Sequence, residues 1–360
     1  MKFRSLFFSV LCMLMTGGLF TSCSDDNDDD KKNDEGTKVE LPGKRVFTLC
    51  EGAYTQNNAL LTFYAPNHET ATINDIFFKQ NDAKLGDTGQ HAIAYNNNIY
   101  ISMYGSRYVC RLNSAGVEQK RYAFTEEQGQ PRFLEAEDGK LYVTLSSGHV
   151  ARLDATSLTL EKMVKVGKNP EHLIEEDGKL YVVNSGFGYD NRLSIIDLNT
   201  FDQAENVEIF QNPQDIVEAN DQIFILGYGA PYPDYTNPVV IYDRATKKYE
   251  EIGKGTYMCE NDDVVYIIYS ETNFDDNTTN HLYSYNARTN KKIEKAFIQM
   301  PAELQNDIIT GFSIDPENGD FYIGAGGYSN TGDVYRFKKD GTFIEKFGTG
   351  VAPKYSVFIY

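Results

Sequence analysis

The sequence contains no tryptophan and only five histidines in 360 residues. None of the histidines stands in the HExxH or a related zinc-binding spacing, and no GxSxG motif marks a hydrolase nucleophile. These absences argue against the common metallohydrolases and serine hydrolases. Proteins that bind glycans often stack sugar rings on tryptophan, so its absence counts mildly against a glycan ligand, although tyrosine can take that role.

Positive charge is also scarce, since 52 acidic side chains outnumber 34 basic ones and give a formal net charge of −18. Residues 24–40 hold eight of the acidic residues and three lysines. When this segment and the two basic residues Lys2 and Arg4 are left out, the remaining body has a net charge of −15. So acidic a body repels nucleic acid unless it carries a basic stripe, and the sequence shows none. We therefore expect no nucleic-acid partner.

Cysteine is too sparse for a disulfide framework. Cys50, Cys110 and Cys259 lie in the body of the chain and show no metal-ligand spacing. One bridge among these three is an open alternative, but buried free thiols are the favoured interpretation.

The longest apolar run of the N-terminus is too short for a membrane span. Leu6–Met15 covers ten residues, whereas a transmembrane helix needs ~20. With its two preceding basic residues this pattern predicts a secretory signal peptide over residues 1–22. Leu19–Cys23 resembles a bacterial lipobox, which implies lipidation of Cys23. The alternative is an ordinary signal peptide with an unrelated cysteine.

Residues 23–40 are predicted to be a tether. The run SDDNDDDKKNDEGTK has no apolar side chain that could join a core, so it should be disordered. Asp25 and Asp26 resemble a signal for export to the outer leaflet of the outer membrane, although a plain solvated spacer would look the same. We expect a lipid-anchored protein of the outer membrane, exposed at the cell surface, with a globular body at 41–360.

The body is built from one repeated pattern. GKLYVVNSG at 178–186 nearly copies GKLYVTLSSG at 139–148, and weaker copies follow a spacing of 42, 39, 43, 42 and 56 residues. The aromatic residues that mark the copies are Tyr100, Tyr142, Tyr181, Phe224, Tyr266 and Tyr322. A further copy at 44–52 precedes them.

Each copy predicts four short antiparallel strands. A segment that often contains proline leads into an apolar strand, a turn rich in Asn, Asp and Gly leads to the aromatic strand, and two more strands follow. We find no convincing amphipathic helix in the body. Four strands every ~40 residues are typical of an all-β propeller.

The two ends of the body predict how the ring closes. Residues 352–360 match the first strand of a copy and then stop, whereas the copy at 44–52 lacks that strand. The C-terminal strand should therefore join the N-terminal blade and give seven four-stranded blades. Two separate β domains would leave both half-blades unexplained.

One face of such a propeller carries the loops between the second and third strands together with the segments that lead into each blade. Gly-rich and Pro-rich sequences such as SGFGYDN free the side chains of these loops from strand geometry. The candidate ligand-binding residues of the loops are Tyr54, Tyr104, Phe187, Tyr189, Asn191, Tyr228, Tyr232, Tyr235, Phe274 and Tyr328. Those of the inter-blade segments are His91, Arg132, Glu171, His172, Asp215, Tyr257 and Tyr355.

Two alternatives apply to this face. The tyrosines could merely cap the blades, but three of them in the single Pro-rich loop 227–238 bury poorly and suit an interface. Glu51, Glu171, His172 and Asp215 could converge on a metal ion, although one polar residue per blade is also what a non-catalytic central funnel needs.

The stretch Arg45–Tyr64, RVFTLCEGAYTQNNALLTFY, resembles the opening of the YncE-like propeller lipoproteins of gut Bacteroidota. Cys50 stands where that family usually has Asn, while Glu51-Gly52 and Asn58-Ala59 keep the pattern. The resemblance extends through the lipobox, the acidic tail and the blades to nearly the whole chain. Its BtuG-type branch binds cobalamin and passes it to a TonB-dependent transporter.

The resemblance implies a binding protein for cobalamin or a related corrinoid, with a TonB-dependent outer-membrane transporter as partner and no catalytic residues or cofactor. No individual contact is carried over from the family. A propeller hydrolase or lyase with a divalent metal, and a protein-protein or glycan-binding module, are the alternatives.

Overall fold

The computed structural model describes residues 33–66, 72–272 and 278–360. The predicted signal peptide, Cys23 and Phe274 lie outside these residues. Within them, no helix is long and apolar enough to cross a membrane.

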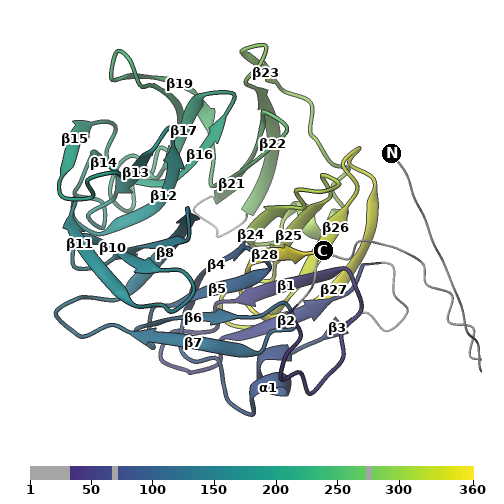
Figure 1. The fold of residues 1–360 in the computed structure, drawn as a ribbon. Helices are drawn as coiled ribbons and strands as arrows, with labels where there is room; N and C mark the ends of the chain where they lie inside the picture. Colours follow the sequence, from purple (N-terminus) through teal and green to yellow (C-terminus); the bar gives the residue numbers. More distant parts are fainter. Residues whose placement is uncertain (1–32, 67–71, 273–277) are drawn as a thin grey trace, which may run out of the picture. The chain divides into compact units, whose positions relative to one another are not determined.

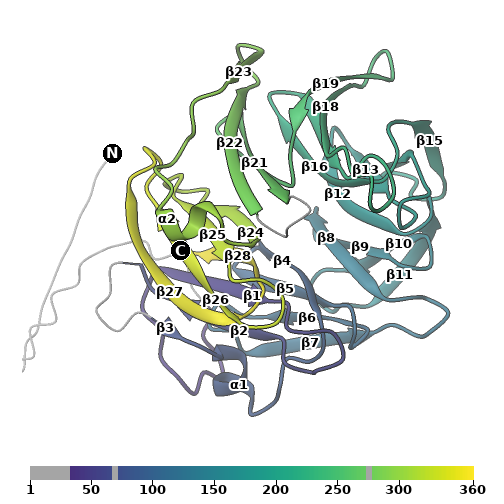
Figure 2. The same ribbon diagram turned by 180° about the vertical axis from the view of Figure 1, so that it is seen from behind.

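The described chain folds into seven four-stranded antiparallel sheets, as predicted (Figures 1 and 2). Blade 1 consists of β28 (Pro353–Ile359), β1 (Arg45–Cys50), β2 (Leu60–Tyr64) and β3 (Thr72–Ile73). Blade 2 consists of β4 (Gly89–Tyr95), β5 (Asn98–Met103), β6 (Tyr108–Leu112) and β7 (Glu118–Ala123). Blade 3 consists of β8 (Pro131–Glu137), β9 (Lys140–Leu145), β10 (His149–Asp154) and β11 (Leu160–Lys165). Blade 4 consists of β12 (Pro170–Glu176), β13 (Lys179–Asn184), β14 (Arg192–Asp197) and β15 (Ala204–Glu208).

The remaining blades repeat the arrangement. Blade 5 consists of β16 (Pro213–Ala219), β17 (Gln222–Gly227), β18 (Pro238–Asp243) and β19 (Lys248–Lys254). Blade 6 consists of β20 (Tyr257–Asn261), β21 (Val264–Thr272), β22 (Thr278–Asn286) and β23 (Lys291–Ile293). Blade 7 consists of β24 (Ile309–Ile314), β25 (Phe321–Ala325), β26 (Thr331–Phe337) and β27 (Phe343–Val351). The first strands of the blades contact one another in ring order, so they form the inner wall.

The turn between the first two strands explains the repeated Asn, Asp and Gly residues. In blade 3, Asp138 and Gly139 have φ angles of 48° and 72°, and in blade 4, Asp177 and Gly178 have 52° and 72°. Positive φ at both central residues is the geometry of a type I′ turn, which matches the twist of the flanking strands. Asn and Gly tolerate this conformation better than other residues.

The hydrophobic core lies between the blades. Tyr100 and Val109 of blade 2 form one buried cluster with Leu134 and Leu141 of blade 3, and the other blade interfaces repeat this pattern. A single blade would leave such a face in water, so each blade depends on its neighbours for stability.

The ring closes as predicted, because β28 pairs with β1 and completes blade 1. Val357 packs in the cluster between blades 1 and 2, whereas Phe358 packs with Tyr322 and Val334 of blade 7. The C-terminal strand therefore joins both neighbours of the shared blade.

Two short helices in the described residues depart from the all-strand prediction. α1 (Ile76–Asn81) begins after Asp75, whose side chain accepts a hydrogen bond from Phe78 N–H. α2 (Ala302–Gln305) lies in the segment that leads into blade 7. That segment accounts for the long final spacing of 56 residues in the repeat.

Residues 33–40, which we assigned to the tether, pack against the propeller. Asp34 accepts two hydrogen bonds from Arg45, at 2.6 and 2.8 Å. The buried amide of Gln80 accepts from the backbone N–H groups of Lys38 and Val39, at 2.8 and 3.1 Å. The ordered body therefore extends at least to residue 33.

The three body cysteines are free thiols, as favoured from the sequence. Cys50 and Cys110 are buried and Cys259 is half-buried. Burial raises the pKa of the Cys50 thiol to about 11, so this thiol is inert at neutral pH.

Deleting residues 353–360 should open the ring. The truncation removes the burial of Val357, Phe358 and Ile359, each worth about 1.5–3 kcal/mol, and leaves the edge of β1 unpaired. We expect a large drop in the melting temperature or no cooperative melting, measured by circular dichroism. Ser356→Ala, which keeps the strand and loses one hydroxyl, is the control. A truncated protein that melts like the control would contradict closure by β28.

Candidate functional site

The loops between the second and third strands lie on the same end of the propeller as the inter-blade segments. Backbone hydrogen bonds join the two sets within a blade, such as Tyr104 N–H to Thr88 O at 2.8 Å and Tyr228 N–H to Asn212 O at 3.0 Å. We call this end the loop face. All candidate residues that the structure describes belong to it or to the channel below it.

The loop face gathers exposed aromatic side chains. Twelve large hydrophobic side chains are exposed in the described part of the chain, and seven of them lie on the loops of the loop face. Exposed hydrophobic surface is therefore concentrated at this end of the propeller. They are Tyr54, Phe187, Tyr189, Tyr228, Tyr232, Tyr235 and Tyr328. Exposure of these seven argues against blade caps, which would be buried.

Two neighbouring loops of blades 4 and 5 form an aromatic sector of the loop face, residues 186–191 and 228–237. Tyr228 and Tyr235 stack with ring centroids 4.7 Å apart, and Tyr232 lies edge-on to Tyr235 at 6.0 Å. Gln211 Nε2 donates to Gly188 O at 2.7 Å and ties the first loop to the segment leading into blade 5. Ring contacts thus order the three tyrosines of the second loop, and the bond to Gly188 O fixes the backbone of the first loop.

Tyr104 and Asn191 are half-buried, so only part of each side chain is accessible to a ligand on the loop face. The guanidinium of Arg132 lies 5.7 Å from the centre of the Tyr104 ring, within cation–π range. Arg132 also forms an ion pair with the buried carboxylate of Glu171. Asn169 and Ser185 donate to the other oxygen of Glu171, both at 2.6 Å.

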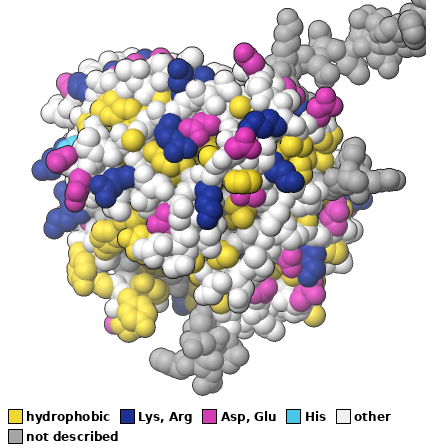
Figure 3. All heavy atoms as spheres, turned by 90° about the horizontal axis from the view of Figure 1, so that it is seen from below, with side chains coloured by type: hydrophobic (Ala, Val, Ile, Leu, Met, Phe, Trp, Pro, Cys, Tyr) yellow, Lys and Arg dark blue, Asp and Glu magenta, His cyan; other side chains and the backbone are white. Residues whose placement is uncertain are grey.

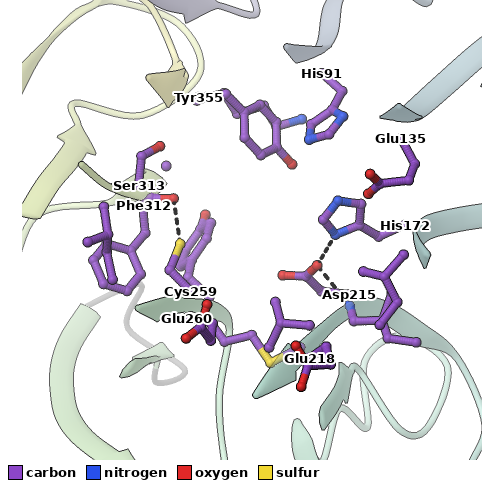
Figure 4. Close-up of a pocket in the computed structure, with 18 of the residues that line it drawn as sticks. His91, Glu135, His172, Asp215, Glu218, Cys259, Glu260, Phe312, Ser313 and Tyr355 are labelled. Carbon is purple, nitrogen blue, oxygen red and sulfur yellow. Dashed lines mark hydrogen bonds and ion pairs between the residues drawn. The ribbon is translucent and has the colours of Figure 1, made fainter. Parts of the chain in front are cut away.

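A cavity of about 400 Å³ lies on the axis of the propeller, and side chains from all seven inner strands line it (Figure 4). Five of the residues that we assigned to the inter-blade segments face it, and the structure places each of them in the first strand of its blade: His91, His172, Asp215, Tyr257 and Tyr355. The sequence analysis missed several other lining residues, among them Glu135, Glu218, Glu260 and Phe312.

Irregularities in the strand ladder determine which side chains reach this cavity. In blade 4 the register between β12 and β13 shifts between Pro170 and Leu173, so Glu171 points to Arg132 while His172 faces the centre. The same shift occurs near the start of β4, β8, β16 and β24. A bulge of this kind re-aims side chains without changing the fold.

The wall of the cavity holds a compact aromatic group. The imidazole of His91 lies 5.0 Å from that of His172 and 4.5 Å from the ring of Tyr355, both edge-on. His91 Nδ1 accepts a hydrogen bond from Leu134 N–H at 3.1 Å. His172 Nδ1 is hydrogen-bonded to Asp215 (Figure 4).

The two histidines differ in their charge preference. Burial, His172 and Lys354 hold the pKa of His91 well below its usual value, so His91 is neutral and its proton lies on Nε2. Burial also opposes charge on His172, but Asp215, Glu135 and Glu171 outweigh it and raise the pKa of His172. Burial raises the pKa of Glu135 to about 7.

The carboxylates proposed as alternative metal ligands are paired with separate cations. Glu51 lies 3.0 Å from Lys354, Glu171 pairs with Arg132 and Asp215 pairs with His172. Among the described residues, no group of three His, Cys, Asp or Glu side chains is placed to hold a metal ion.

Charges are mixed on the surface that Figure 3 shows. Lys and Arg side chains lie among Asp and Glu side chains, and on the described residues of that face they form no continuous basic stripe.

A family model described as "Domain of unknown function (DUF5074)" matches residues 44–225, just over half of the chain. The chain belongs to this family. No curated protein matches the sequence.

Several solved structures share the fold of this DUF5074 protein at low sequence identity. Hydrazine synthase of Kuenenia stuttgartiensis is 15% identical with a TM-score of 0.61, over 74% of this chain and 88% of that one. A functionally unknown protein of Desulfotomaculum acetoxidans is 9% identical with a TM-score of 0.60, over 89% and 99%. A protein of unknown function from Bacteroides caccae is 9% identical with a TM-score of 0.50, over 88% and 99%. At these identities the likeness concerns the fold alone.

Glu135→Gln should flatten the pH dependence of stability. Glu135 has a pKa of about 7 in the folded protein, against an ordinary value of 4.5. Between these values the folded protein keeps a proton that the unfolded chain releases, so stability falls as the pH rises and levels off above about 7. We expect the variant to match the original protein near pH 5 and to exceed it at pH 8 by about 1–3 kcal/mol.

Urea unfolding at both pH values measures this difference. Glu137→Gln on the same strand, which does not line the cavity, is the control and should keep the original slope. Equal losses of stability from pH 5 to 8 in all three proteins would show that Glu135 is not desolvated.

Proposed function

We propose that this protein is a surface lipoprotein of the outer membrane that binds cobalamin or a related corrinoid on its loop face and delivers it to a TonB-dependent transporter. The observation that carries the proposal is the gathering of seven exposed aromatic side chains on that face. Soluble surfaces rarely keep such a group without a ligand or partner.

The central cavity is too small to enclose a whole corrinoid, so a corrinoid would bind mainly on the loop face. A cavity of about 400 Å³ is in the range that suits drug-sized molecules, and a corrinoid is larger. Such a ligand would lie across the loops and send at most one substituent into the channel. Tyrosine suits this role because its ring covers apolar surface while its hydroxyl reaches the amides that surround a corrin ring.

The polar groups near the axis are held in place by ion pairs and hydrogen bonds. Arg132, Asn169 and Ser185 satisfy the Glu171 carboxylate, and Asp215 holds His172. These contacts hold the side chains in fixed orientations, so they present a constant set of polar groups to a ligand. The anchor and the transporter partner rest on the N-terminal sequence and on the resemblance to the YncE-like lipoproteins.

Calorimetric titration with cyanocobalamin tests the proposal. We expect saturable binding, and replacement of Phe187 or Tyr232 by Ala should weaken it by about tenfold or more, which corresponds to ~1.4 kcal/mol. Both side chains are highly exposed, at 68% and 81%, so their removal should leave the fold intact.

Tyr249→Ala is the matched control, because Tyr249 is also exposed, at 45%, but lies on the outer strand β19. It should bind like the original protein. Absence of both heat and a shift in melting temperature at micromolar cyanocobalamin would refute corrinoid binding. Co-purification of a transporter without ligand binding would instead favour a protein-interaction module.

A further inference from the structure

A second pocket opens on the loop face where blades 3 and 4 meet. Its volume is about 440 Å³. Three segments form it: the loop 146–148 of blade 3, the inter-blade segment 165–169, and the start of the loop that carries Phe187. It therefore borders the aromatic sector and is separate from the central cavity.

All charged side chains that line this pocket are basic: Lys165, Lys168 and Arg192. Both lysines are exposed, and neither forms an ion pair with any described residue. Such a local excess of positive charge is unexpected on a body with a net charge of −15. Two unpaired cations in one concave site attract an anion.

Arg192 is fixed at the edge of the pocket. Its guanidinium donates to both oxygens of Asp190, at 2.7 and 2.5 Å. Asp190 also accepts from Lys168 N–H at 2.7 Å, so one carboxylate positions the arginine and the backbone of the inter-blade segment together. This pairing balances Arg192 and leaves the charge of the two lysines free for a ligand.

The neighbouring groups do not neutralise the lysines. His149 lies opposite Lys165 across the β10–β11 pair. Phe187 is 68% exposed at the mouth of the pocket, where its ring can cover an apolar part of the same ligand.

We infer that this pocket binds an oxyanion, namely a phosphate group carried by a ligand whose flat or apolar part rests on Phe187. Lysine is a common phosphate ligand because its ammonium acts as a compact point charge with three donors. The inference deepens the proposed function and rests on it for the identity of the ligand: cobalamin carries one phosphodiester, in the arm that links its nucleotide base to the corrin ring.

The test compares two corrinoids by calorimetry. Cyanocobalamin contains the phosphodiester, whereas cobinamide lacks it together with the base. We expect the original protein to prefer cyanocobalamin by about tenfold, and the double variant Lys165→Gln/Lys168→Gln to lose that preference while still binding cobinamide. The control Lys162→Gln/Lys179→Gln removes the same charge from two exposed lysines outside the pocket and should keep the preference.

Equal affinity for the two corrinoids in the original protein, or a preference that survives in the Lys165/Lys168 variant, would overturn the inference. If neither corrinoid binds, the proposed function fails, and titration with phenyl phosphate monitored by phosphorus NMR tests the pocket by itself. A saturable shift that disappears in the Lys165/Lys168 variant supports the oxyanion site, and no shift in the original protein rules it out.

Discussion

The pairing of β28 with β1 is the contact on which the rest of the molecule depends. Each blade buries its faces only against its neighbours, so the stability of the ring depends on every interface between blades. The C-terminal strand supplies the inner strand of blade 1 and packs on both adjacent blades through Val357 and Phe358. Without it, two blade faces and two strand edges would meet water.

Closure also creates the candidate site. The central cavity exists because seven inner strands face one axis, and no single blade contains enough of its wall to bind anything. His91, His172 and Asp215 come from blades 2, 4 and 5, yet they form one connected group across the channel. The outer loops, by contrast, are positioned by local hydrogen bonds within a blade or to the next inter-blade segment.

The blades, their number and the shared first blade could be predicted from the repeat, because every copy has the same pattern of four strands. Local chemistry was sufficient there: Asp138-Gly139 and Asp177-Gly178 specify their turns without help from the rest of the chain. The short helix α1 escaped prediction because six residues are too few for a periodic signal. Exposure of the aromatic loop residues followed from their Gly-rich and Pro-rich surroundings.

The wall of the cavity was harder to predict. Glu171 and His172 are adjacent in the sequence, and only the shift in the β12–β13 register decides that the histidine faces the axis. Glu135 was missed for the same reason, since the bulge in β8 sets the direction of every later side chain on that strand. A one-residue irregularity reverses inward and outward positions, and nothing in a single sequence marks where it occurs.

The contact between Asp34 and Arg45 fixes the position of the first residues that the structure describes. β1 runs from Arg45 to Cys50, and the residues after Cys50 belong to the loop face, so Arg45 and the segment bound to it lie at the opposite pole. Arg45 also donates to Ser114 O, in the turn between β6 and β7. The N-terminal segment that the structure describes therefore lies at the pole opposite to the exposed aromatic rings, and it leaves the loop face open to a ligand.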